Sequence, residues 1–148
     1  MYKHIMLPVD GSELSLKASN ECFRFAKTIG AGVTAMHVVA HGTLVIEEAL
    51  SSNEVERLKK DYETAASKAA QVILSKLEAE AGKLGVKCDS VVVVGDNPYQ
   101  EIIDQATRSG CDLIMMASHG RRFLQSLLLG SETVKVLTHC KIPVLVVR

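Results

Sequence analysis

Residues 4–12 read HIMLPVDGS: an apolar run from His4 to Val9, followed at once by Asp10, Gly11 and Ser12. The run is nearly continuous and does not alternate with polar residues, which is typical of a strand buried on both faces of a sheet. Asp-Gly is a turn signal, and a serine hydroxyl can cap a helix. The stretch therefore predicts a buried strand that turns directly into a helix, the unit from which parallel sheets are built.

Four more segments share this character, and helical spacing fills the gaps between them. The further predicted strands are Val33–Val39, Cys88–Val94, Leu113–Ala117 and Pro143–Val147. The helical segments contain Leu14 to Ile29, Asn53 to Lys83, Ile102 to Ala106 and Val134 to Leu137. This alternation predicts a Rossmann-like α/β fold: an open five-stranded parallel sheet with right-handed crossovers and helices on both faces.

Capping residues support the same division of the chain. Ser12 is expected to cap the first helix, and Asn97 before Pro98 is a start signal for the third. Glycines stand where three helices should end, at Gly30, Gly85 and Gly110. The long second helix is predicted to place one apolar stripe against the sheet, made of Val55, Leu58, Tyr62, Ala65, Ala69, Val72, Ile73, Leu77 and Leu84.

Length and composition narrow the class of protein. A chain of 148 residues with 47% hydrophobic and 23% charged side chains is expected to form one domain, 1–148. Its 17 basic and 17 acidic side chains give no net charge, which argues against nucleic acid or an anionic membrane as the main partner. No apolar run is long enough to span a membrane, and the first residues lack a signal peptide pattern. Four widely separated cysteines without a CxxC spacing favour reduced thiols and a cytoplasmic location.

The candidate binding site lies where the first and fourth predicted strands end. Ligands of open parallel sheets bind outside the carboxyl ends of the strands, where the strand order reverses. After the fourth strand, Gly120, Gly130 and Ser131 form a glycine-bearing loop before the last helix. Glycines and a helix start favour a phosphate, although Ser131 could equally be only a helix N-cap and the glycines only turn formers.

The known nucleotide fingerprints bear on the ligand class. Neither GxGxxG nor GxxxxGK[ST] occurs in the chain, which argues against a dinucleotide dehydrogenase and a P-loop ATPase. The spacing Ala117-x2-Gly120-x9-Gly130-Ser131 instead resembles the motif G-x2-G-x9-G-[ST] of nucleotide-binding members of the universal stress protein family. The resemblance extends from the opening segment 5–12 to the closing segment 143–147. It departs from the family at Ala117, which replaces the first glycine and is harmless if it keeps strand geometry.

The resemblance implies an adenine nucleotide alpha hydrolase-like fold and a set of nucleotide ligands. Pro8 and Asp10 would lie near the ribose and adenine, and Val38 would line the adenine pocket. Gly120, Gly130 and Ser131 would hold the phosphates. The predicted site also includes neighbours of these residues, for which a turn, a solvated surface or a packing role remains an alternative: Val9, Ala117, His119, Arg121 and Glu132.

The function implied is an ATP-binding regulatory protein of the stress response, without efficient turnover. ATP would bind with Mg²⁺ or Mn²⁺, whose ligands the sequence does not identify, and no catalytic set of residues emerges. Bound nucleotide would bias the conformation of the segment His41–Ser52, that of the loop Arg121–Ser126, or an interface with a partner. A homodimer through the apolar strand Ile142–Val147 is expected. Two alternatives stay open: a dimeric scaffold of the same fold that binds no nucleotide, and a weak metal-dependent ATPase that uses Asp10.

Overall fold

Five parallel strands form a single sheet within the residues that the computed structural model describes, which are 1–42, 51–119 and 129–148. The spatial order is β3-β2-β1-β4-β5, so β1 lies at the centre and β3 and β5 are the edges. The strands are β1 (His4–Pro8), β2 (Gly32–Val39), β3 (Cys88–Val94), β4 (Leu113–Ala117) and β5 (Val144–Val147).

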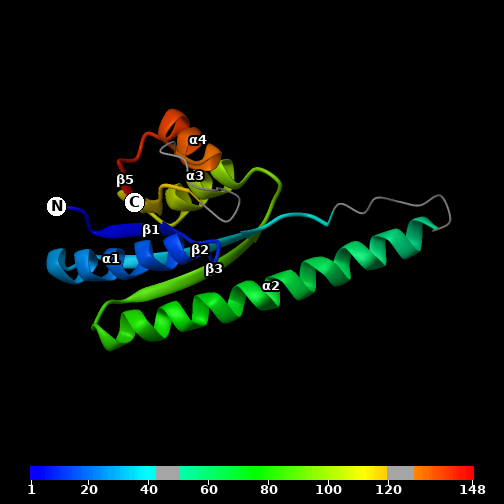
Figure 1. Ribbon diagram of the computed structural model, residues 1–148, viewed down its shortest axis with the longest axis horizontal. Coiled ribbons are helices and arrows are strands. Elements are labelled where there is room, and N and C mark those ends of the chain that lie inside the picture. Colours follow the sequence, from blue (N-terminus) through cyan, green and yellow to red (C-terminus); the bar gives the residue numbers. More distant parts are fainter. Residues whose placement is uncertain (43–50, 120–128) are drawn as a thin grey trace.

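Two helices cover each face of this sheet (Figure 1). The helices α1 (Glu13–Ile29) and α2 (Ser52–Lys83) pack on one face, and α3 (Pro98–Arg108) and α4 (Ser131–His139) pack on the other. The predicted parallel sheet with helices on both faces is therefore confirmed. Strand boundaries differ from the predicted ones by one residue at β1, β2 and β5.

Successive residues of β1 enter two separate cores. Ile5 and Leu7 pack with Phe23 of α1 and Leu74 of α2, whereas Met6 packs on the opposite face among residues of α3 and α4. Ile5, Met6 and Leu7 are all fully buried. Each such side chain stabilises the fold by about 2 kcal/mol, and the alternation of side chains along a strand sends them to both faces. This explains why the run is apolar at every position.

Most predicted caps are formed as expected. The Ser12 hydroxyl accepts a hydrogen bond from the Ser15 N–H at 3.2 Å. Gly30, Gly85 and Gly110 have φ angles of 71°, 74° and 65°, the left-handed conformation that favours glycine after a helix. The prediction for Asn97 is wrong in one respect. Asn97 precedes α3 and Pro98 opens it, but the Asn97 side chain makes no capping hydrogen bond.

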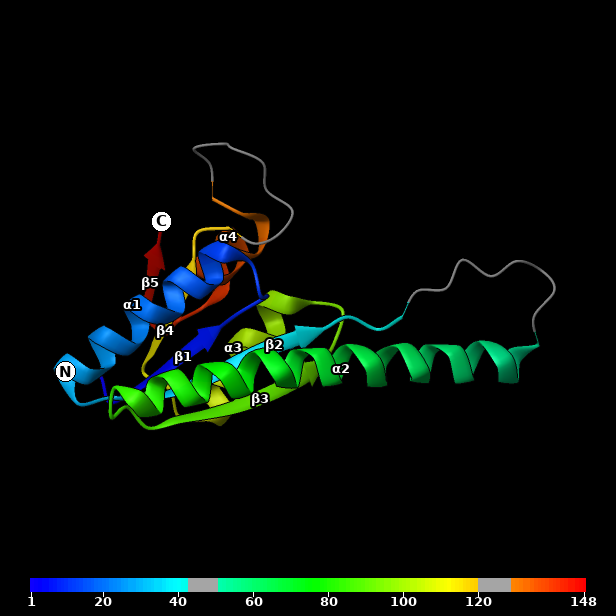
Figure 2. The same cartoon turned by 60° about the horizontal axis from the view of Figure 1, so that its bottom comes forward.

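The predicted apolar stripe of α2 is also wrong in part. The residues of its second half that face the sheet and are buried are Ala70, Leu74, Leu77 and Ala81. Leu58, Tyr62 and Val72, which were expected in the core, are 39%, 52% and 56% exposed. For Leu58 and Tyr62 the physical reason is the length of the helix: its first half extends beyond the strands, where no sheet lies beneath it (Figures 1 and 2). Val72 lies in the second half, on a different face of the helix from the buried Ala70 and Leu74.

A smaller shift of the buried face occurs in two other helices. In α4, Val136 of the helical pattern is buried together with Thr133, whereas Val134 and Leu137 are exposed. In α1, Phe25 and Ile29 of the pattern are only partly buried, and the buried residues are Ser15, Ala18, Ser19, Cys22, Phe23 and Ala26. Small and polar side chains were overlooked as core residues because hydrophobicity alone does not mark them.

Asp112 ties the start of β1 to the start of β4. Its carboxylate accepts the backbone N–H of Lys3 at 2.9 Å and that of His4 at 3.0 Å. Burial by itself would raise the pKa of Asp112, but the hydrogen bonds from His4 and Lys3 outweigh it, so the pKa lies below its ordinary value. The ionised carboxylate therefore stabilises the folded chain at neutral pH.

Replacing this carboxylate should destabilise the fold in a pH-dependent way. We expect Asp112→Ala to lower the free energy of unfolding by about 1–2 kcal/mol at pH 7, because two N–H groups lose a charged acceptor. Since the folded pKa is lowered, the difference from wild type is full above the ordinary pKa of 3.8 and shrinks as the pH falls through the folded pKa. Urea unfolding at pH 7 and pH 3 measures it.

Asp89→Ala is the matched control, because Asp89 is an exposed residue whose ion pair with Lys87 is long, at 3.9 Å. It should change the stability by less than about 0.5 kcal/mol. An equal effect of the two substitutions at both pH values would contradict the role given to Asp112.

Candidate functional site

The strand order reverses between β1 and β4. From β1 the chain moves outward to β2 and β3, then crosses back to β4 and β5 on the other side. β1 and β4 are aligned in parallel, with Ile5 opposite Leu113. Their carboxyl ends therefore open at the same edge of the sheet, the place where ligands of such folds bind. Of the predicted site residues, Gly120 and Arg121 lie outside the described part of the chain, as does most of the segment 41–52 and the loop 121–126.

A fixed turn leads from β1 into α1. Asp10 Oδ1 accepts the Ser12 N–H at 2.9 Å, and Gly11 between them has a φ of 79°. The Ser12 hydroxyl then caps α1 through Ser15. An aspartate that accepts the N–H two residues on is a common turn device, and it holds the carboxylate at the end of β1. The turn role and the predicted ligand role of Asp10 are therefore compatible.

Gly130 is held against the end of β4 by its backbone. Its N–H donates to the Ser118 carbonyl at 2.7 Å. A methyl group on Gly130 would lie 3.0 Å from the His119 Cα and 3.3 Å from the Ser118 oxygen. Because the φ of Gly130 is an ordinary −62°, the glycine is required here by close packing of two backbone segments and not by its dihedral angles.

The start of α4 carries no side-chain cap. Gly130 is the N-cap residue and Ser131 is the first residue of the helix, so the alternative that Ser131 is the N-cap is wrong. Ser131 is exposed. The first N–H groups of a helix have no partner within it, and together with the helix dipole they favour an anion. This end of α4 adjoins β4 through the contact between Gly130 and Ser118.

Ala117 has the strand geometry that was expected for it. It is the last residue of β4, pairs with Val147 of β5 and is 8% exposed. Its carbonyl oxygen accepts the Thr133 hydroxyl at 3.1 Å, a second link between β4 and α4. Next to it, the Ser118 hydroxyl and His119 Nδ1 are 3.0 Å apart.

The remaining predicted adenine-side residues lie at the ends of β1 and β2. Val9 is buried and donates its N–H to the Met36 carbonyl at 2.8 Å, which extends the pairing of the two strands beyond Pro8. Val38 is partly buried and packs against the core beneath α3 and α4. The structure thus gathers these residues with Asp10, Ala117 and the start of α4 at one edge of the sheet.

Glu132 has structural partners on α3. One carboxylate oxygen accepts the Tyr99 N–H at 2.9 Å, and the other accepts Lys135 Nζ at 2.8 Å. Tyr99 is in the first turn of α3, so Glu132 supplies the acceptor that Asn97 does not. The hydrogen bond to Glu132 raises the pKa of Lys135. No spacing in the sequence indicates this link, because it joins residues 33 positions apart.

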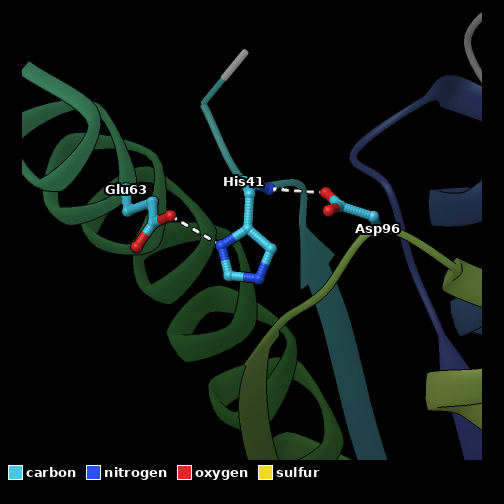
Figure 3. A network of polar contacts seen from close by, with 3 residues as sticks. All are labelled: His41, Glu63 and Asp96. Atoms are coloured by element: carbon cyan, nitrogen blue, oxygen red, sulfur yellow. Dashed lines mark hydrogen bonds and ion pairs between the residues drawn. The ribbon is translucent and has the colours of Figure 1, made fainter. Parts of the chain in front are cut away.

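A second polar cluster lies at the carboxyl ends of β2 and β3 (Figure 3). His41 Nδ1 is 2.7 Å from Glu63 Oε1 of α2, and the His41 N–H donates to Asp96 Oδ1 at 3.1 Å. The hydrogen bond with Glu63 is the main cause that raises the pKa of His41, and the charges of Asp96 and Glu101 add to it. Sequence analysis missed this cluster because its members lie far apart in the chain.

The described residues include no cluster of metal ligands, and burial keeps two of the thiols protonated. Within 1–42, 51–119 and 129–148 there is no group of three or more metal-ligating side chains. Burial raises the pKa of Cys22 to about 12 and that of Cys111 to about 11, so these thiols stay protonated at neutral pH. No helix in the same part of the chain is long and apolar enough to cross a membrane.

The His41 cluster makes a prediction about titration. Glu63→Gln should lower the pKa of His41 toward its ordinary value of 6.5, because the main hydrogen bond to a carboxylate is lost. A pKa raised on folding means that the charged pair stabilises the fold below pH 6.5 and that this contribution is lost as the pH rises through the folded pKa. NMR titration of the His41 ring checks it. Glu56→Gln, an exposed change on α2, is the control, and an equal pKa in both variants would refute the assignment.

Comparison with known proteins shows which protein family the chain matches. The model of the universal stress protein family matches residues 1–148. The universal stress protein MJ0531 of Methanocaldococcus jannaschii is 35% identical over 150 residues, covering 100% of this chain and 83% of the relative. MJ0577 of the same organism is 30% identical over 156 residues, covering 100% and 96%.

Solved structures of universal stress proteins have the same fold as this chain. The structure of MJ0577 has a TM-score of 0.83 at 31% identity, with 99% of this chain and 96% of that one covered. Two structures that share the fold are complexes: a universal stress protein with cAMP, at a TM-score of 0.68 and 22% identity, and one from Archaeoglobus fulgidus with dAMP, at 0.67 and 19%. Each of these two covers 99% of this chain and 97% or more of its own. The chain belongs to the universal stress protein family.

Proposed function

We propose that this protein binds ATP, with Mg²⁺ or Mn²⁺, at the carboxyl ends of β1 and β4 and acts as a regulatory protein of the stress response without efficient turnover. The observation that carries the proposal is the start of α4. There Gly130 is pressed against Ser118 and His119, and among the described residues no side chain caps the helix. A helix start of this kind offers N–H donors and a positive dipole end to phosphate oxygens.

The residues fit the parts of an adenine nucleotide. Gly130 and Ser131 would hold phosphates, together with Gly120 of the motif. Asp10, fixed by its turn, would accept a ribose hydroxyl, and the partly buried Val38 offers apolar surface to the base, whereas Val9 is buried in the core. The complexes of family members with cAMP and dAMP support an adenine ligand. Family membership of the whole chain supports a single stress-protein domain, and the four free cysteines support a cytoplasmic location.

Calorimetry with ATP and Mg²⁺ tests the proposal. We expect binding by the wild-type chain and at least tenfold weaker binding by Gly130→Ala, whose methyl group would push the start of α4 away from β4. Gly82→Ala is the control, because a methyl group there meets nothing within 4 Å. Absence of binding by folded wild-type protein at high micromolar nucleotide would overturn the proposal.

A non-binding scaffold is the second candidate, and Ala117 is the residue that favours it. In that case Ala117→Gly should create ATP binding where the wild type has none. The weak ATPase alternative makes a different prediction: Asp10→Asn would abolish product release while leaving the affinity for ATP nearly unchanged. Equal loss of both would make Asp10 a binding residue only.

We also propose a homodimer through residues 142–147. β5 is an edge of the sheet, and Val144 to Val147 are only partly buried within one chain. Val134 and Leu137, on the helix that leads into β5, are 45% and 42% exposed. An apolar edge strand tends to pair with a second chain unless it is covered.

A charged side chain in β5 should prevent the β5 strands of two chains from pairing. We expect Val146→Lys to halve the mass in solution at micromolar concentration, measured by light scattering after size exclusion. Thr64→Lys, a change at an exposed residue of α2 away from this edge, is the control. An unchanged mass with Val146→Lys would exclude β5 as the contact.

A further inference from the structure

Helix α2 carries a second apolar stripe, most of which stays exposed in the folded chain. The stripe that packs on the sheet is Ala70, Leu74, Leu77 and Ala81. A different set of residues follows the spacing three, four, three, four, three along the first part of the helix: Val55, Leu58, Tyr62, Ala65, Ala69 and Val72. Only Val55 of this set is buried, and the other five are exposed.

This second stripe, the α2 heptad stripe, has the pattern of a helix-pairing surface. Apolar residues at alternating steps of three and four occupy the a and d positions of a heptad repeat, which faces another helix and not a sheet. All six such positions from 55 to 72 are apolar. Much of the stripe lies on the half of α2 that extends beyond the strands (Figure 2). It is therefore accessible to a second helix.

Residue size indicates what that second helix is. In an antiparallel pair of α2 helices, a positions face d positions of the other copy. One register places Tyr62 opposite Ala65 of the second copy, and the same register places Leu58 opposite Ala69 and Val55 opposite Val72. A large side chain then faces an alanine at Tyr62 and at Leu58, and two valines of equal size face each other in the outer layers, which fills space evenly. A parallel pair would place tyrosine on tyrosine and alanine on alanine.

The charges beside the stripe permit the same arrangement. The flanking g positions are Glu54, Asp61 and Lys68, so acidic residues precede a basic one along the helix. An antiparallel second copy brings Glu54 of each chain near Lys68 of the other and places the two Asp61 carboxylates opposite each other, so two attractive pairs accompany one repulsive pair. Side-chain size, and not charge, therefore selects the antiparallel orientation. We propose that the α2 heptad stripe binds the same stripe of a second copy of this chain in antiparallel orientation.

This contact is separate from the β5 edge. α2 packs over β2 and β3, at the opposite side of the sheet from β5. A chain that uses both surfaces has two different two-fold contacts and assembles beyond a dimer.

Light scattering after size exclusion, over about 10–200 µM, tests the contact. We expect the double variant Leu58→Glu/Tyr62→Glu to have at most half the mass of the wild type at the highest concentration. Thr64→Glu, an exposed change on another flank of α2, should keep the wild-type mass. Far-UV circular dichroism of both variants checks that the helix is intact. This readout does not depend on nucleotide.

Disulfide trapping tests the register. When Tyr62→Cys and Ala65→Cys chains are mixed and oxidised, the mixture should cross-link at least several-fold more than either variant alone or the unsubstituted chain with its own four cysteines.

An equal mass for wild type and double variant overturns the proposal. An unchanged mass together with a loss of thermal stability in the double variant would show that the stripe packs within one chain, which also overturns the proposal. Cross-linking only between identical variants would indicate a parallel pair and would likewise overturn the antiparallel one.

Discussion

The whole structure depends on covering strand β1 on both faces at once. Ile5 and Leu7 need α1 and α2 on one side, and Met6 needs α3 and α4 on the other. A parallel strand cannot be followed immediately by its neighbour, because the chain must cross back over the sheet, and each crossing supplies one covering helix. The central position of β1, between β2 and β4, follows from this requirement. The candidate site exists because β1 lies where the crossings change direction.

The site is built mostly from backbone. The turn at Asp10, the contact of Gly130 with Ser118 and the start of α4 present N–H and carbonyl groups whose positions are set by strands and helices. Thr133 and Glu132 fix α4 by hydrogen bonds to β4 and α3. A ligand bound at the start of α4 would therefore contact a helix that is linked to the sheet and to its neighbouring helix. Such links are the physical means by which a small ligand alters a larger surface.

Sequence reasoning was most successful where one residue carries a strong local signal. Continuous apolar runs marked the five strands, and glycines marked three helix ends, because burial on both faces and positive φ restrict the residue type. It failed where a structural feature depends on a contact with residues far away in the sequence. Nothing near Asn97 shows that Glu132 caps α3, and nothing in α2 shows where the sheet beneath it ends. The motif predicted which residues meet at the strand ends, but the steric need for Gly130 becomes visible only when His119 is placed against it.

The anchoring of β1 by Asp112 bears on the order in which the chain assembles during synthesis. Lys3 and Asp112 are 109 positions apart, and β1 pairs with β4 only after residues 113–117 exist. Until the ribosome has released them, the nascent central strand has β2 on one side and an open hydrogen-bonding edge on the other. Long-range pairing of this kind slows folding and leaves apolar edges exposed to association. The early part of the chain thus keeps an open strand edge until β4 has been synthesised.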